Sequence, residues 1–173
     1  IQLFSTSYMS KDENYTKYFE YFNFFVFSML LLVLSGNFLV MFFGWELVGL
    51  SSFLLISFWS EKKSAARAGN KAFILNRIGD FGFLIGLMMI LNEFQTFNFL
   101  SIFESTLETK PENLDVIIVF LLLGAFGKSA QFPLFSWLPD AMEGPTPASA
   151  LIHAATMVTA GVFMLVRISP ILQ

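Results

Sequence analysis

Long apolar runs separated by short polar segments make up most of the 173-residue chain. A helix needs about 20 mostly apolar residues to cross a bilayer. Five stretches approach that length, some of them with breaks, and they cover residues 18–34, 38–59, 71–91, 114–136 and 148–168. The pattern predicts an all-α integral membrane protein whose five helices form a single transmembrane domain over residues 1–173.

Charges in the connecting segments indicate how these helices are oriented. Residues 60–71 carry four basic residues and one acidic residue, whereas residues 92–115 carry five acidic residues and one basic residue. Positive residues in short loops stay on the cytoplasmic side, or on the matrix side in a mitochondrion. We therefore expect the basic segment to face the inside and the acidic segment the outside. Alternation then places the connection over residues 137–147 inside as well.

The composition supports a membrane location and excludes several kinds of site. Hydrophobic residues make up 55% of the chain and charged residues 13%, about half the charged share of a soluble domain. The net charge of −3 argues against nucleic acid as a partner. Cysteine is absent, which excludes disulfides and thiolate sites, and the single histidine with scattered carboxylates forms no metal-ligand cluster of ordinary spacing.

Three ionisable residues, Glu46, Lys128 and His153, lie well inside the predicted helices. Such groups at membrane depth cost roughly 2.5–3.5 kcal/mol and are functional candidates by default. Lys128 follows Asp115 by roughly 20 Å of helix, which places it past the middle of the bilayer. Glu46 lies near the middle of its own stretch. We expect Glu46 and Lys128 to lie at similar depth and to relieve each other's desolvation.

A lysine suits a buried site that has to change its charge. When a neighbouring carboxylate moves away or is neutralised, a buried lysine can release its proton near neutral pH, whereas an arginine stays protonated. The alternative is a static ion pair that fixes helix packing. His153 can exchange protons under physiological conditions, so it is a candidate relay; the alternative is a histidine hydrogen-bonded to a backbone carbonyl.

Further charged residues lie nearer the predicted inner side. Arg77 and Asp80 are three residues apart, so they share one helix face and are expected to pair. That pair is either a structural salt bridge or part of gating and proton entry. Asp140 and Glu143 stand between prolines, where turn formation and helix capping explain them. Proton capture at a channel mouth is the other interpretation.

Pro133 interrupts the fourth apolar stretch, and two interpretations stay open. Proline removes one backbone hydrogen bond and displaces another, and in lipid the freed carbonyls must be satisfied by protein or water. A broken helix beside Lys128 would suit a water-filled half-channel, as in transporters. Alternatively, the helix ends near Phe132 and the chain turns through residues 137–139. The aromatic residues Trp45, Trp59, Trp137 and Tyr21 are attributed to membrane packing and interface preference.

Three long motifs resemble a known family. The stretches "GWELVGLSSFLLISFW", "NRIGDFGF" and "GKSAQFPLFSWLPDAMEGPTPASALIHAATMVTAGVFMLVR" are similar to the antiporter-like membrane subunits of respiratory complex I. The resemblance covers most of residues 19–168. It implies a fold of two inverted five-helix repeats, each with a broken helix, of which this chain carries the first. The second repeat is missing, so either the subunit is split between two chains or this is a partial chain.

The resemblance also implies which residues act. The glutamate of the "GWE" helix falls on Glu46, the lysine of "GKSAQ" on Lys128 and the histidine of "LIHAATMV" on His153. The aspartate of the "NRxGD" stretch falls on Asp80. Many relatives carry a polar residue where this chain has Phe135, which puts an accessory role there in doubt.

The implied function is proton translocation in the membrane arm of NADH:ubiquinone oxidoreductase, through a Glu46, Lys128 and His153 relay driven by redox chemistry elsewhere. The expected partners are other membrane-arm subunits, a separate chain with the second repeat, and lipid. No cofactor or metal is expected in this chain, and the expected location is the mitochondrial inner membrane in preference to a bacterial plasma membrane. The alternatives are a subunit of a multi-subunit monovalent cation/proton antiporter and a non-transporting scaffold.

Overall fold

The computed structural model describes residues 1–108 and 111–171, and these residues fold almost entirely into helices. The predicted all-α class is therefore confirmed. The elements in chain order are α1 (Gln2–Tyr8), α2 (Tyr15–Val33), α3 (Phe38–Ile56), α4 (Lys63–Phe94), α5 (Phe99–Glu108), α6 (Leu114–Lys128), η1 (Asp140–Glu143), α7 (Thr146–Ala150), η2 (Leu151–Ala155), α8 (Met157–Arg167) and η3 (Ser169–Ile171).

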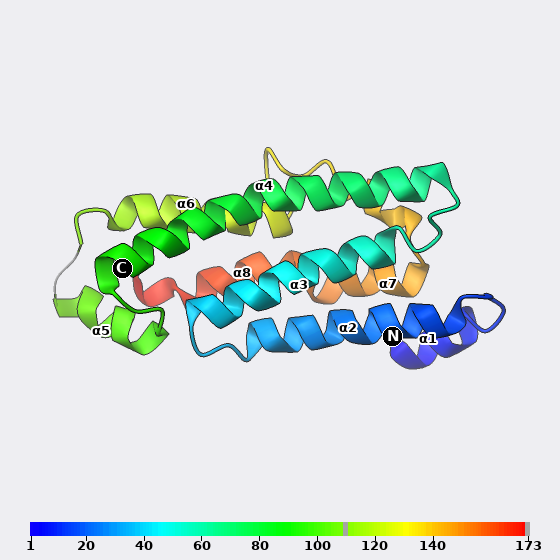
Figure 1. Cartoon of the computed structure of the whole chain (residues 1–173), viewed down its shortest axis with the longest axis horizontal. Coiled ribbons are helices and arrows are strands. Elements are labelled where there is room, and N and C mark those ends of the chain that lie inside the picture. The colour runs from blue at the N-terminus through cyan, green and yellow to red at the C-terminus, as the bar shows by residue number, and fades with distance from the viewer. Residues whose placement is uncertain (109–110, 172–173) are drawn as a thin grey trace.

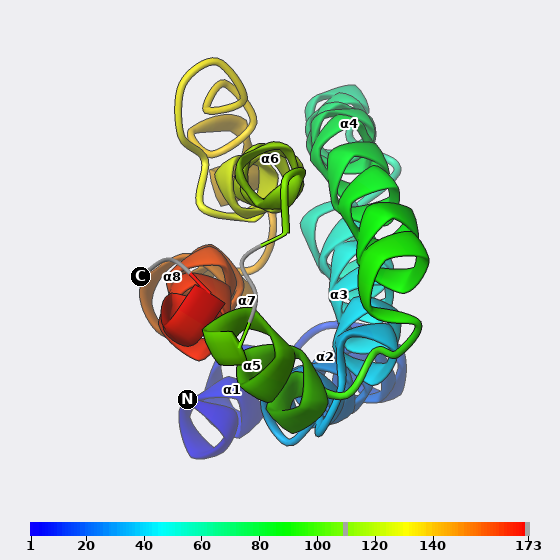
Figure 2. The same cartoon turned by 90° about the vertical axis from the view of Figure 1, so that its left-hand side faces the viewer.

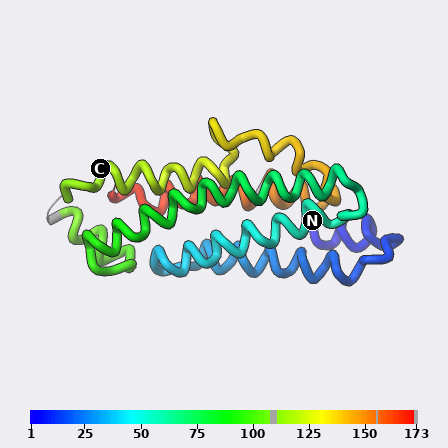
Figure 3. Tube along the Cα trace, turned by 45° about the horizontal axis from the view of Figure 1, so that its top comes forward, coloured from blue at the N-terminus to red at the C-terminus, as the bar shows by residue number. Residues whose placement is uncertain are grey.

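The long helices lie side by side along the longest axis of the molecule (Figure 1). Viewed from the end, α6 packs on α4, α4 on α3 and α3 on α2, while α8 lies beside α6 (Figure 2). The short helices α1 and α5 lie at opposite ends of the bundle (Figure 3). In the described part of the chain, three helical stretches are long and apolar enough to cross a membrane, at Phe38–Ile56, Lys63–Phe94 and Thr146–Arg167.

The backbones of α4 and α6 approach each other closely. A Cβ atom added at Gly79 would lie 3.0 Å from the Cα of Gly127. An added Cβ at Gly82 would lie 2.6 Å from the Leu123 side chain, and one at Gly124 would lie 2.8 Å from the Phe83 side chain. Small residues at helix interfaces let backbones approach closely inside a membrane. The glycines on this seam bring the side chains that flank them, Asp80 and Lys128, within reach of each other.

Two helix boundaries differ from those expected from the sequence. Helix α4 begins at Lys63 rather than near residue 71, because the basic segment is rich in alanine, lysine and arginine, which are strong helix formers. Helix α6 ends at Lys128 rather than near residue 133. Ala130 has a φ of 49°, in the left-handed region that ends a helix. The break thus falls directly after the lysine instead of at the proline.

The last predicted helix is also interrupted. The short helix α7 continues into η2, a π-helical turn over Leu151–Ala155, and Thr156 separates this turn from α8. The side chain of Thr156 donates to the Leu151 carbonyl at 2.7 Å. Such π-helical turns inside helices frequently mark functional sites. His153 lies within this turn.

Candidate functional site

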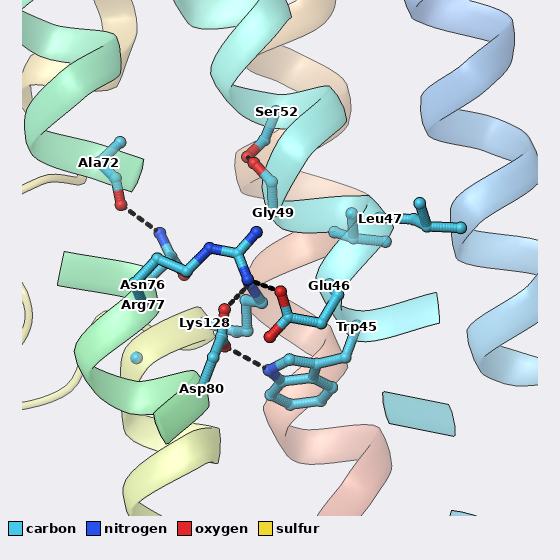
Figure 4. Close-up of polar contacts among 12 residues, drawn as sticks. Trp45, Glu46, Leu47, Gly49, Ser52, Ala72, Asn76, Arg77, Asp80 and Lys128 are labelled. Atoms are coloured by element: carbon cyan, nitrogen blue, oxygen red, sulfur yellow. Dashed lines mark hydrogen bonds and ion pairs between the residues drawn. The ribbon is translucent and has the colours of Figure 1, made fainter. Parts of the chain in front are cut away.

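A buried ion pair between Lys128 on α6 and Asp80 on α4 forms the centre of the site (Figure 4). The Lys128 Nζ donates to Asp80 Oδ2 at 3.2 Å, and the two side chains are 0% and 3% exposed. Each charge offsets part of the desolvation cost of the other, and removing one partner alone would leave an uncompensated buried charge. Lys128 occupies the last turn of α6, where a positive charge is also favoured by the helix dipole.

Two residues of α3 complete the surroundings of this pair. The indole Nε1 of Trp45 donates to Asp80 Oδ1 at 2.8 Å, so both carboxylate oxygens of Asp80 accept a hydrogen bond. The Trp45 ring centroid lies 5.9 Å from Lys128 Nζ, within cation–π range. Gly49 lies one turn further along α3, where an added Cβ would be 2.9 Å from Lys128 Nζ. The ammonium group therefore fills the space that Gly49 leaves open.

A second ion pair joins Arg77 on α4 to Glu46 on α3. These side chains are 39% and 22% exposed, so this pair is more accessible than the central one. The Arg77 guanidinium also lies over the Phe73 ring, 4.7 Å from its centroid. Arg77 lies less than one turn before Asp80 on α4, so its positive charge is close to the Lys128–Asp80 pair. The two ion pairs are thus electrostatically linked.

The pairing corrects two expectations from the sequence. Glu46 was expected to pair with Lys128, and Arg77 with Asp80, but the structure pairs Lys128 with Asp80 and Arg77 with Glu46. The reason is that α4 contacts α3 and α6 at once. Although Arg77 and Asp80 lie three residues apart, their ion-pair partners lie on different helices: Asp80 pairs with Lys128 on α6, and Arg77 pairs with Glu46 on α3.

His153 lies close to this centre without touching it. Its ring stacks on Trp137, with centroids 6.2 Å apart, and Trp137 Nε1 donates to the carbonyl of Gly127 at 3.1 Å. Trp137 therefore stands between His153 and the end of α6. Neither ring nitrogen of His153 forms a hydrogen bond of standard geometry with the described residues, although the Ala141 backbone lies near the ring. The structure thus brings together Glu46, Arg77, Asp80 and Lys128, with His153 one aromatic ring away.

A hollow of about 440 Å³ opens where the predicted inner connection meets α4. Lys71 donates to Asp140 at 2.7 Å across it, and Ser64 donates to Glu143 at 3.0 Å. Asp140 and Glu143 belong to η1, and their side chains accept hydrogen bonds from α4 in addition to forming part of a turn. Both link the broken segment to the basic end of α4.

Two site residues, Trp45 and Trp137, are not predicted from the sequence. Trp45 and Trp137 were assigned to packing and the membrane interface, yet both are fully buried and both donate a hydrogen bond at the site. Buried tryptophan usually finds a partner for its N–H group. The position of Trp45 in the middle of an apolar stretch, away from either interface, was the signal that could have identified it.

An apolar helical bundle with one buried ion pair, a second and more accessible ion pair, and a broken helix beside them is typical of multi-pass membrane proteins that carry charged groups at membrane depth. A family model described as "NADH:quinone oxidoreductase/Mrp antiporter, TM" matches residues 35–173. The chain belongs to this family of NADH:quinone oxidoreductase and Mrp antiporter transmembrane domains. The expected integral membrane fold and the resemblance to the antiporter-like subunits are therefore confirmed.

Individual relatives come from both branches of the family. The chain is 52% identical over 173 residues to NADH-ubiquinone oxidoreductase chain 5 of Rhizopus stolonifer, covering 100% of this chain and 26% of that protein. It is 49% identical over 171 residues to NADH-quinone oxidoreductase subunit L of Mycobacterium tuberculosis, covering 99% and 27%. A chain of the Mrp complex from Dietzia sp. DQ12-45-1b matches with a TM-score of 0.78 and 35% identity, covering 84% and 16%. The chain spans about a quarter of the length of the curated relatives.

Proposed function

We propose that this chain is part of a proton-translocating membrane subunit of NADH:ubiquinone oxidoreductase, and that Lys128 is its central proton-carrying group. The observation that carries the proposal is the complete burial of the Lys128 ammonium against Asp80 at the end of a broken helix. A lysine buried in this way can change its charge when its surroundings change. An arginine would hold the same ion pair permanently.

The second ion pair supplies a way to change those surroundings. While Glu46 neutralises Arg77, the Lys128 ammonium is held by Asp80. If Glu46 is protonated or moves away, Arg77 keeps an uncompensated positive charge that repels Lys128. Lys128 then releases its proton to nearby water and on to His153, while Trp45 continues to donate to the Asp80 carboxylate. We propose that redox chemistry elsewhere in the assembly drives this change.

The relatives support a place in a multi-subunit membrane complex. The full-length relatives are named as chain 5 and subunit L of NADH oxidoreductases, and the matching structure is of an Mrp complex. We infer that other membrane-arm subunits and a second five-helix repeat are the partners, in the mitochondrial inner membrane or a bacterial plasma membrane.

The match to the Mrp complex favours one alternative, a subunit of a monovalent cation/proton antiporter. The same ion pairs could serve that activity. The two functions differ in their energy source: an oxidoreductase subunit pumps only while NADH is oxidised, whereas an antiporter exchanges ions down a gradient. Proton movement in membrane vesicles with NADH, compared with an imposed sodium gradient, separates them.

Lys128→Met tests the proposal in the intact assembly. Methionine has a similar length without the charge, so we expect proton pumping to be abolished while the complex still assembles. Pumping would be followed as acidification of inverted vesicles during NADH oxidation, and assembly by native gel electrophoresis. Loss of the assembled complex would support a scaffold instead, and normal pumping would exclude Lys128 from the path.

A further inference from the structure

One buried polar atom beside the ion pairs takes no part in the contacts described so far. Asn76 on α4 is 2% exposed, and its Nδ2 donates to the Ala72 carbonyl at 2.8 Å. Its Oδ1 has no hydrogen-bond donor among the residues the structure describes. The amide orientation is fixed, because a carbonyl can only accept. A buried acceptor without a donor costs about 1–3 kcal/mol, so a donor is expected at this atom.

The position of Asn76 connects the ion pair to the hollow at the basic end. Asn76 lies one turn before Asp80 on the same face of α4. Its side chain folds toward Ala72, one turn nearer the basic end. Ala72 is buried, and so is Ala68, which lies one turn nearer the basic end. Ala68 also lines the hollow that the Lys71–Asp140 ion pair spans. A row of small residues thus leads from the hollow to Asn76.

Lys128 has donors to spare at the other end of this row. An ammonium group carries three N–H donors, and Asp80 is the one hydrogen-bond acceptor that Lys128 has within the described part of the chain. The α4 turn that carries Asn76 packs directly against α6 just before Lys128, because an added Cβ at Gly127 would lie 3.6 Å from the Asn76 backbone carbonyl. A spare acceptor and spare donors therefore occur on touching turns.

We propose that Asn76 Oδ1 binds a water molecule that links Lys128 to the hollow lined by Lys71 and Asp140. This inference rests on the proposed function and names the route on one side of Lys128. The water donates one hydrogen to Asn76 Oδ1 and accepts from the ammonium directly or through a second water. A buried polar site of this kind is where ordered water is found in proteins.

Protons pass between Lys128 and Asp140 through the waters that lie between them. An N–H bond of Lys128 breaks and its proton joins the water oxygen, while that water passes one of its own protons to the next water toward the hollow. Lys128 is left as a neutral amine. The arriving proton is taken up by the Asp140 carboxylate, which neutralises it and weakens its ion pair with Lys71. During pumping these steps run in reverse: after Lys128 has released its proton toward His153, a proton leaves Asp140, passes through the waters and reprotonates the Lys128 amine.

Three variants in the intact assembly test this route. Asn76→Leu keeps the volume and removes the acceptor, so we expect a several-fold loss of protons pumped per NADH oxidised with normal assembly. Asn76→Ser retains a hydroxyl that can hold the same water, and most pumping should return. Ser28→Ala is the control, because Ser28 on α2 loses a similar bond to its own helix, at 2.7 Å to Phe24, far from the site. Normal pumping by Asn76→Leu, or equal loss in Asn76→Ser, overturns the inference.

A second measurement keeps the test decisive if Asn76→Leu fails to assemble. A high-resolution cryo-EM map of the unmodified assembly should show water density within hydrogen-bond distance of Asn76 Oδ1, and a dry site overturns the inference. Failure here is separable from failure of the proposed function. If Lys128→Met stops pumping while Asn76→Leu does not, only the route is wrong; if Lys128→Met pumps normally, the proposed function is wrong.

Discussion

The buried Lys128 ammonium needs an opposite charge, an aromatic face and enough space among its neighbours. Asp80 supplies the opposite charge, Trp45 supplies an aromatic face and holds the far oxygen of Asp80, and Gly49 leaves the space. Each contact depends on one atom of one residue: a carboxylate oxygen, an indole N–H or a missing Cβ. Small substitutions at these residues should therefore change the protonation equilibrium of Lys128 without changing the fold.

Gly49→Ala tests the space beside the ammonium. The added Cβ would lie 2.9 Å from Lys128 Nζ, so the ammonium has to move relative to Asp80. We expect a cost of about 1–3 kcal/mol in stability and a clear loss of proton pumping. Gly36→Ala is the matched control, because nothing lies within 4 Å of the added atom there. Equal pumping by the two variants would show that Gly49 does not shape the site.

Trp45→Phe tests the hydrogen bond to Asp80. Phenylalanine keeps a buried ring but loses the Nε1 donor, and a hydrogen bond to a charged group contributes about 1.5–3 kcal/mol. We expect slower pumping and a lower melting temperature of the purified assembly. Trp59→Phe loses the same kind of bond, at 2.9 Å to Asp12 outside the site, and should leave pumping unchanged. A matching loss in both variants would argue for a general packing effect.

The sequence was informative about which charges are buried and much less about how they pair. Lys128 was predicted to lie deep within its helix and is buried, whereas Asp80 was placed nearer the inner side and is buried beside it, and the Glu46 side chain is 22% exposed. Partner choice depends on how each helix is rotated about its axis and on which helix it meets, which are tertiary properties. The Arg77–Glu46 pair illustrates this, because the local three-residue spacing favoured Asp80 as the partner of Arg77.

Among the helices, the seam between α4 and α6 matters most for the site. Gly79 and Gly127 let the two backbones meet, and Asp80 and Lys128 are their immediate neighbours in sequence. The distance across the ion pair therefore depends on this seam. Substitution of a seam glycine should affect the whole helix pair, since backbone atoms cannot rotate away as a side chain can.

Gly79→Val tests this dependence. The Cβ alone would lie 3.0 Å from the Gly127 Cα, so the helices must separate, at a cost of about 1–3 kcal/mol or more. We expect reduced amounts of assembled complex on native gels, together with lost pumping. Ile78→Val changes the adjacent, exposed residue and should assemble normally. Normal assembly by Gly79→Val would contradict the tight seam.

Helix boundaries show where sequence patterns stop being sufficient. The apolar helices can be predicted from their composition. The start of α4 cannot, because a segment of basic residues has the same low hydropathy as a loop. The end of α6 is set at Ala130 and by tertiary bonds such as the one from Trp137 to the Gly127 carbonyl. The additional helix α5 lies within the acidic segment, which has no long apolar run that would predict a helix.

For the whole molecule, we propose that the described site forms part of a proton path across the membrane. The hydrocarbon core is about 30 Å thick, and Lys128 lies where α6 stops partway along the bundle. The hollow at Lys71 and Asp140 opens on the basic end. Because the chain spans about a quarter of its curated relatives, we propose that the remainder of such a protein completes the path.

The most direct measurement of the central claim is proton pumping per NADH oxidised by the double variant Asp80→Asn/Lys128→Met in the intact assembly. Replacing both members of a buried ion pair by neutral groups of similar size is often harmless to stability, so the complex should assemble. We expect assembled complex with pumping abolished, because the proton-carrying group is gone. Assembled complex that pumps at the normal ratio would show that the pair is a static element of packing.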